Sequence, residues 1–76
     1  AATVRFELAR ESQVEIEVYD LRGALVRRIV SGPRTAGAYS ESWDGRDRTG
    51  RRLPKGVYLL RFTADRHRES RKLVVL

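Results

Sequence analysis

The stretch VEIEVYDLRGALVRRIV, residues 14–30, decides the fold class of this chain. Its first half alternates apolar and polar residues, which is the period of a β-strand with one buried face. Asp20 can hydrogen-bond its own backbone two residues further on, and Gly23 supplies the positive φ that a three-residue hairpin loop with a bulge requires. The stretch therefore predicts strand, turn and strand. Its predicted inward residues are Val14, Ile16 and Val18, and its predicted outward residues are Glu15, Glu17 and Tyr19.

The same alternation continues on both sides of this hairpin. TVRFEL, residues 3–8, has its apolar side chains at every second position. AYSESW, residues 38–43, places Tyr39, Glu41 and Trp43 on one face. A carboxylate between two inward aromatic residues predicts either a position at a sheet edge or pairing with an arginine, because an unpaired buried charge is very costly.

The remaining segments complete an all-β pattern. SGPRTAG, residues 31–37, has the composition of a loop. GVYLLRFTA, residues 56–64, is apolar on both faces, which predicts a central strand between covered neighbours. ESRKLVVL, residues 69–76, closes the chain as a last strand. We expect six or seven short strands in an antiparallel β-sandwich or a small barrel.

Length and composition limit the chain to a small single domain. With 76 residues it buries only about 60% of the surface that its unfolded form exposes. The absence of cysteine excludes a disulfide framework and a thiolate metal site. No run of apolar residues is long enough for a membrane helix, and the N-terminus lacks the pattern of a signal peptide. We expect residues 1–76 to form one domain without a membrane span.

The net charge of +6 is concentrated in the second half of the chain. Residues 1–45 carry six arginines against seven carboxylates, whereas residues 46–76 carry ten basic residues against three acidic ones. Such a bipolar chain can steer acidic partners, or copies of itself, toward its basic end. Most of the basic residues are arginines, whose planar group suits bidentate pairing with carboxylate or phosphate.

Three motifs in order carry a family resemblance: YDLRG, residues 19–23, WDGRDRTG, residues 43–50, and KGVYLLR, residues 55–61. Together they resemble the immunoglobulin-like domain of the flagellar hook-capping protein and the related C-terminal sorting and anchoring domains of exported bacterial proteins, including type IX secretion cargo. The resemblance implies a non-catalytic, immunoglobulin-like antiparallel β-sandwich that works outside the cell or at its surface. Such domains often begin with a segment rich in Asn and Pro, which is missing before Ala1, so we expect a fragment or a terminal domain of a larger exported protein.

The segment between the last two motifs combines turn residues with basic residues. The residues expected to define the architecture are Asp20, Gly23, Trp43, Asp44, Gly45, Gly50, Gly56 and Tyr58. Between these fixed points the chain is free to carry basic side chains, and Asp47, into solvent. The candidate binding surface consists of Arg46, Arg48, Arg51, Arg52 and Lys55.

The sequence gives little support for a catalytic site or a metal site. Asp44 and Asp47 resemble part of a calcium loop but lack the alternating oxygen ligands and terminal Glu of an EF-hand. His67 lies next to Glu69 and Ser70 along an extended turn, which is not the arrangement of a nucleophile and its base. Glu15 and Glu17 on one exposed strand face are the ordinary pattern of a solvated sheet rather than a glycosidase pair. We expect no enzyme activity, no cofactor and no metal site.

Nucleic-acid binding is a further alternative, because basic residues lie near Trp43, Tyr58 and Phe62. These aromatic residues alternate as core residues, however, and no RNP-like element is present. The first half of the chain is also net acidic. We therefore do not expect nucleic acid as a partner.

Two hypotheses about function remain. In the first, the chain is a sorting, attachment or spacer domain of an exported surface protein, and it contacts secretion machinery or anionic surface glycolipid. In the second, it is a self-assembling structural subunit of an extracellular filament or cap. The basic half of one copy would then meet Glu15 and Glu17 of the next, and strand addition at an open sheet edge would join them. The first predicts a monomer, and the second predicts assembly that depends on concentration.

Overall fold

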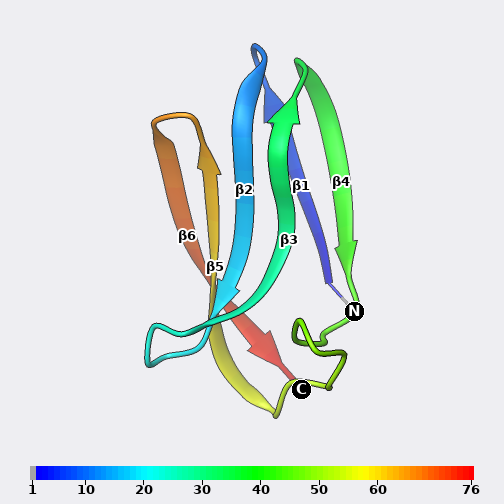
Figure 1. Ribbon diagram of the computed structural model, residues 1–76, viewed down its shortest axis with the longest axis vertical. Helices are drawn as coiled ribbons and strands as arrows, with labels where there is room; N and C mark the ends of the chain where they lie inside the picture. Colours follow the sequence, from blue (N-terminus) through cyan, green and yellow to red (C-terminus); the bar gives the residue numbers. More distant parts are fainter. Residues whose placement is uncertain (1) are drawn as a thin grey trace.

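The computed structural model describes residues 2–76 as six β-strands in two antiparallel sheets (Figure 1). The strands are β1 (Ala2–Leu8), β2 (Ser12–Tyr19), β3 (Leu25–Arg34), β4 (Gly37–Trp43), β5 (Gly56–Ala64) and β6 (His67–Val75). One sheet pairs β1 with β4, and the other has the order β3-β2-β5-β6. The predicted all-β, immunoglobulin-like sandwich is confirmed, with six strands. Residues 2–76 contain no helix long and apolar enough to cross a membrane.

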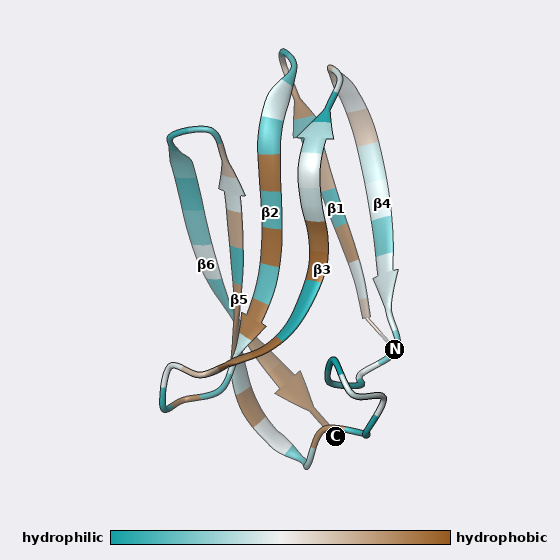
Figure 2. Ribbon diagram, viewed as in Figure 1, coloured by the Kyte–Doolittle hydropathy of each residue, from teal (hydrophilic) through white to brown (hydrophobic). Residues whose placement is uncertain are grey.

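Strand β2 lies at the centre of the core. Its inward residues Val14, Ile16 and Val18 are 0% exposed, as their alternation predicts. In Figure 2 the apolar bands alternate with polar ones along β2, which is the pattern of a strand with one face in the core. The apolar residues of β1 also point inward, and its last one, Leu8, is buried.

Two clusters of buried residues make up the core. The upper core, near the end of β1, contains Leu8, Val14, Ile16 and Val30. Phe6 packs beside it, with its ring 5.1 Å from that of Tyr39 and 5.2 Å from that of Phe62. The lower core, near the end of β4, contains Val18, Trp43, Leu53 and Tyr58. Each cluster joins side chains from both sheets.

The hairpin between β2 and β3 has the predicted geometry. The Asp20 N–H donates to the Ala24 carbonyl at 3.0 Å, and Asp20 Oδ1 accepts from the N–H groups of Arg22 and Ala24, each at 2.9 Å. Gly23 has a φ of +90°, which few other residues adopt without strain. The carboxylate and the glycine therefore close this turn together.

The predicted loop over residues 31–37 is wrong for five of its seven residues, because β3 includes residues 31–34 and β4 begins at Gly37. Strand β3 continues to Arg34, which pairs with Ser12 at the start of β2. Pro33 is tolerated because β3 is an edge strand, where a missing N–H can face away from the ladder. Only residues 35–36 connect β3 to β4.

Strand β5 is central, as predicted, but only one of its faces is covered. It lies between β2 and β6, with Tyr58 buried on the inner face. Val57 and Leu59 point to the other face and are 39% and 40% exposed. The expectation of two covered faces is wrong because a second sheet packs against only one side of the four-stranded sheet.

The carboxylate between the inward aromatic residues is paired with an arginine, one of the two predicted solutions. Tyr39 and Glu41 are half-buried and Trp43 is buried, so the three share the inward face of β4. Glu41 Oε1 lies 3.7 Å from Arg34 Nη2, and both side chains are about one third exposed. The ion pair joins the edge of β4 to the edge of β3.

Replacing Trp43 with Ala should lower the free energy of unfolding by about 3–5 kcal/mol, because it removes the largest side chain of the lower core. Denaturant unfolding followed by circular dichroism would measure the loss. Ser42→Ala, on the exposed face of the same strand, is the control and should change the midpoint little. A Trp43→Ala protein as stable as the parent would contradict this core assignment.

Candidate functional site

The candidate site is the basic loop, residues 44–55, which joins β4 to β5. It lies at the end of the sandwich where β1 begins and β6 ends (Figure 1). Each predicted contact residue is exposed: Arg46, Arg48, Arg51, Arg52 and Lys55. The structure therefore leaves all five accessible on the basic loop.

The lower core holds this loop from beneath. Trp43 Nε1 donates to the carbonyl of Arg46 at 3.0 Å. The Leu53 N–H donates to the carbonyl of Gly45 at 3.0 Å, and the Leu53 side chain is only 8% exposed. The sequence reasoning missed Leu53, although a single apolar residue within a basic segment is a signal for an anchor.

Asp47 organises the tip of the basic loop. Its N–H donates to the Arg51 carbonyl at 2.8 Å, and the Gly50 N–H donates to the Asp47 carbonyl at 3.0 Å. Asp47 Oδ1 accepts from the Thr49 N–H and hydroxyl and from the Arg51 N–H, at 2.7–3.0 Å. The expectation that Asp47 is merely carried into solvent is therefore wrong.

The turn at Asp47 repeats the hairpin turn at Asp20 bond for bond. In both, the aspartate N–H donates to the carbonyl four residues on, the glycine N–H donates back, and Oδ1 accepts two backbone N–H groups. The shared spacing, DLRGA at 20–24 and DRTGR at 47–51, was the signal that could have found it. Hydrogen bonds from Thr49 and the loop backbone lower the pKa of Asp47, and the bond from the Ala24 N–H is the main cause that lowers the pKa of Asp20.

Strand β3 holds the basic loop from the side. Arg27 Nη1 donates to the carbonyls of Arg46 and Asp47 at 3.1 and 3.3 Å and lies 3.6 Å from the Asp44 carboxylate. The Arg48 N–H donates to the Val26 carbonyl at 3.1 Å. No sequence signal separates Arg27 from the other arginines, because its role depends on how β3 and the loop meet in space.

Among the five basic residues, Arg46 supports the loop with its side chain, and the other four do not. Arg46 Nη1 donates to the Gly50 carbonyl at 3.0 Å, and its Nε lies 3.9 Å from Asp44. Within residues 2–76, the other four side chains make no hydrogen bond or ion pair: Arg48, Arg51, Arg52 and Lys55. These four side chains are free to bind a partner.

Glu17, one of the two carboxylates expected to receive a neighbour's basic half, is already paired within the domain. Glu17 accepts hydrogen bonds from the Tyr19 hydroxyl at 2.8 Å and from Arg28 at 3.0 Å. Arg61 stacks over the Tyr19 ring at 4.8 Å. Burial alone raises the pKa of Glu17, but the bonds from Tyr19 and Arg28, with the nearby arginine charges, outweigh it and leave that pKa lowered.

The residues considered for other chemistry do not assemble into a site. His67 Nε2 lies 3.5 Å from Glu69, but Ser70 follows on the opposite face of β6. The Asp44 and Asp47 carboxylates each accept hydrogen bonds from their own turn. Across residues 2–76, no group of three or more His, Asp or Glu residues is placed to hold a metal ion.

Comparison with known proteins identifies the family. The family model described as the FlgD Ig-like domain matches residues 1–68. The chain belongs to this family. The crystal structure of FlgD from P. aeruginosa superimposes on this chain, which we refer to as the FlgD-type domain, with a TM-score of 0.68 and 32% sequence identity. The match covers 95% of the domain but only 57% of that FlgD chain, and no curated protein matches.

This family assignment corrects the main functional expectation. A sorting, attachment or spacer role in an exported surface protein is wrong, because the matching family and the matching structure are both FlgD. FlgD is the hook-capping protein that the sequence motifs resemble, and both matches are to it. The alternative, a subunit of a filament or cap, agrees better with this FlgD-type domain.

Replacing Asp47 with Ala should loosen the tip of the basic loop, because the carboxylate accepts three hydrogen bonds there. Hydrogen exchange should become faster at the Thr49 and Arg51 amides while β2 stays protected. Asp47→Asn keeps an oxygen acceptor and should retain most of the protection. Unchanged exchange in the Ala variant would show that the carboxylate does not order the loop.

The domain should lose stability in acid, partly through Glu17. Its folded-state pKa is lowered, so its contribution is present above the unfolded pKa and is lost as pH falls through the folded value. Unfolding measured between about pH 7 and pH 3, which spans the titration of free carboxyl groups, should show this decline. Glu17→Gln should remove part of this decline in stability at low pH, whereas Glu7→Gln, at an exposed position, should not. A Glu17→Gln profile parallel to that of the parent would argue against this role.

Proposed function

We propose that this FlgD-type domain is a non-catalytic structural subunit of a cap-like protein assembly and contacts neighbouring subunits through its basic loop. The observation that carries the proposal is a surface of four basic side chains without internal partners, held on an ordered loop in a domain of the FlgD family. Charge would direct the encounter with an acidic protein surface, and arginine could then pair with carboxylates in a bidentate way.

The ordered backbone of the loop favours a specific contact. Trp43, Asp47 and Arg27 each bond to the loop main chain, so the loop holds one shape before any partner arrives. A preformed loop loses less conformational entropy on binding than a flexible one. The same contacts explain how so many positive charges can be held close together.

The aromatic residues favour a protein partner over single-stranded nucleic acid. Trp43 and Tyr58 are 3% and 7% exposed, and Phe62 is only partly exposed between the sheets. A single-strand binder needs aromatic faces at its surface on which bases can stack. The basic loop offers charge without such a platform.

The domain is also proposed to work outside the cytoplasm as one part of a longer exported protein. Support comes from the FlgD family itself and from the P. aeruginosa FlgD chain, of which the match covers 57%. In such a protein the domain would supply a rigid, charged contact surface rather than a chemical step.

Replacing Arg48, Arg51 and Arg52 together with Ser should weaken assembly without unfolding the domain, because these side chains have no internal partners. Size exclusion with light scattering would follow oligomer mass against protein concentration at low and high salt. We expect the parent to assemble with rising concentration, less so at high salt, and the variant to require at least about tenfold more protein.

The matched control removes three arginines at the opposite end of the sandwich: Arg10, Arg66 and Arg68. It makes the same change in net charge and should shift assembly far less. A parent that stays monomeric at every concentration would overturn self-assembly. An equal effect of both variants would show that net charge, rather than the basic loop, drives association.

A further inference from the structure

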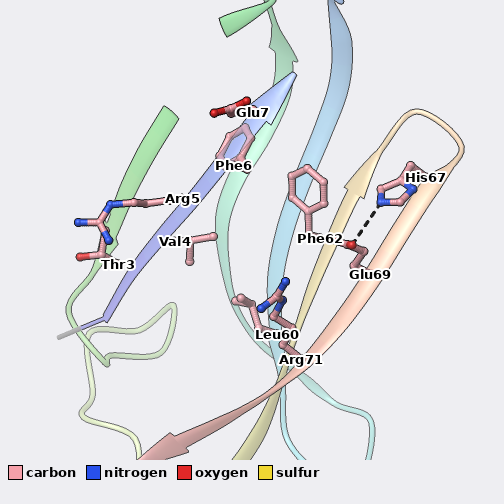
Figure 3. Close-up of a pocket in the computed structure, with 10 residues that line it drawn as sticks. All are labelled: Thr3, Val4, Arg5, Phe6, Glu7, Leu60, Phe62, His67, Glu69 and Arg71. Carbon is pink, nitrogen blue, oxygen red and sulfur yellow. Dashed lines mark ion pairs between the residues drawn. The ribbon is translucent and has the colours of Figure 1, made fainter. Parts of the chain in front are cut away.

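The side chains of β5 alternate between the core and the outer face, which is the side of the four-stranded sheet that faces away from β1 and β4. Leu60 and Phe62 point into the sandwich beside β1 (Figure 3). Leu59 and Arg61 alternate with them and therefore lie on the outer face. Within residues 2–76, no strand packs over this side of the sheet.

The outer face carries a contiguous apolar patch. Val57 lies directly opposite Val74 on β6, and Leu59 lies opposite Tyr19 on β2. The three aliphatic side chains, Val57, Leu59 and Val74, are 39%, 40% and 52% exposed. Exposed apolar residues that are scattered singly are ordinary, whereas a contiguous group of them marks an interaction surface.

The two flanks of this patch differ in charge. Outward residues of β2 include Glu15 and Glu17, and outward residues of β6 include Arg68 and Lys72. Arg28 pairs with Glu17 at 3.0 Å but stays 4.0 Å from Glu15. Among the described residues, the side chains of Arg68 and Lys72 make no hydrogen bond or ion pair. The face is therefore acidic on one side of β5 and basic on the other.

We propose that two copies of the domain pack outer face to outer face about a two-fold axis that runs along β5. A half-turn about this axis carries β6 of one copy over β2 of the other, because the two strands flank β5. The acidic flank of each copy then meets the basic flank of the other. Val57 and Leu59, which lie on β5 itself, each face the same residue of the second copy.

The strand register fixes which side chains meet. Glu15 and Arg68 occupy one row across β5, so the half-turn places Arg68 of one copy over Glu15 of the other. Tyr19 and Lys72 share another row, which brings the Lys72 ammonium near the Tyr19 hydroxyl, an acceptor. The Glu15–Arg68 pair lies at the rim, where an exposed ion pair contributes little to affinity.

Arg61 also lies on β5, where a like charge of the second copy would oppose it. Its guanidinium group stacks over the Tyr19 ring at 4.8 Å and therefore leans toward β2. The half-turn carries the second guanidinium group to the opposite side of the axis. The two positive charges are thus kept apart, and the centre of the contact is left to the apolar side chains.

The charge pattern favours a second copy over an unrelated partner. A partner of one charge sign would match one flank and be repelled by the other. The match involves only residues 15–74, so it does not depend on what precedes or follows them. The face is three strands wide, at the small end of specific interfaces, so we expect dissociation at roughly micromolar to millimolar concentration.

The two-fold contact goes beyond the proposed loop contact, because it closes at two copies and uses no residue of the basic loop. Each contact can therefore fail without the other. The two-fold contact is tested in the variant that replaces Arg48, Arg51 and Arg52 with Ser, where the loop contact is weakened. Sedimentation equilibrium from about 1 μM to 1 mM protein should show a dimer of this variant.

Leu59 gives the decisive substitutions, because a side chain on a two-fold axis faces its own copy. Leu59→Lys and Leu59→Glu should each weaken the dimer at least about tenfold, since like charges meet. An equimolar mixture of the two should dimerise more tightly than either variant alone, because opposite charges then meet. Ser40→Glu adds a charge at an exposed position of β4 and should leave the dimer unchanged. Thermal unfolding followed by circular dichroism would show that each variant is folded.

A loop variant that stays monomeric at about 1 mM would overturn the two-fold contact, even if the parent assembles. A mixture of the two Leu59 variants that is no tighter than either alone would overturn the two-fold geometry. If the parent and the loop variant both stop at the dimer, the two-fold contact is supported and the loop contact fails.

Discussion

The side chain of Trp43 joins three parts of the molecule, namely the two sheets and the basic loop. It comes from the two-stranded sheet, packs in the lower core with Val18 and Tyr58 of the four-stranded sheet, and donates its indole N–H to the Arg46 carbonyl of the basic loop. A buried indole needs such a partner for its N–H. Because one residue meets both demands, the packing of the sheets and the shape of the loop depend on each other.

The basic loop is ordered by bonds that come from outside its charged side chains. Asp47 closes the tip in the way that Asp20 closes the first hairpin, and Arg27 reaches across from β3 to two loop carbonyls. Repulsion between like charges would otherwise favour an extended loop. The carboxylate turns and the clamp offset that repulsion, so the remaining basic groups project from a fixed backbone.

The four edge strands differ in the features that protect them from pairing with another chain. The edge strand β6 carries Arg68 and Lys72, and β3 carries Pro33, and both features discourage pairing with another chain. The Arg34–Glu41 ion pair connects the edges of β3 and β4. Within residues 2–76, β1 pairs with β4 alone, and a groove lined in part by Leu60 and Phe62 lies beside it.

The sequence alone determined the strand faces and the first hairpin, because a period of two and an Asp-to-Gly turn are local properties. It also located the basic residues on one loop, although it missed Leu53 and the role of Asp47. The arginine partner of Glu41, the clamp from Arg27 and the exposure of Leu59 depended on strand order and on how far one sheet covers the other. Those features arise between segments distant in sequence, so only the tertiary structure could decide them.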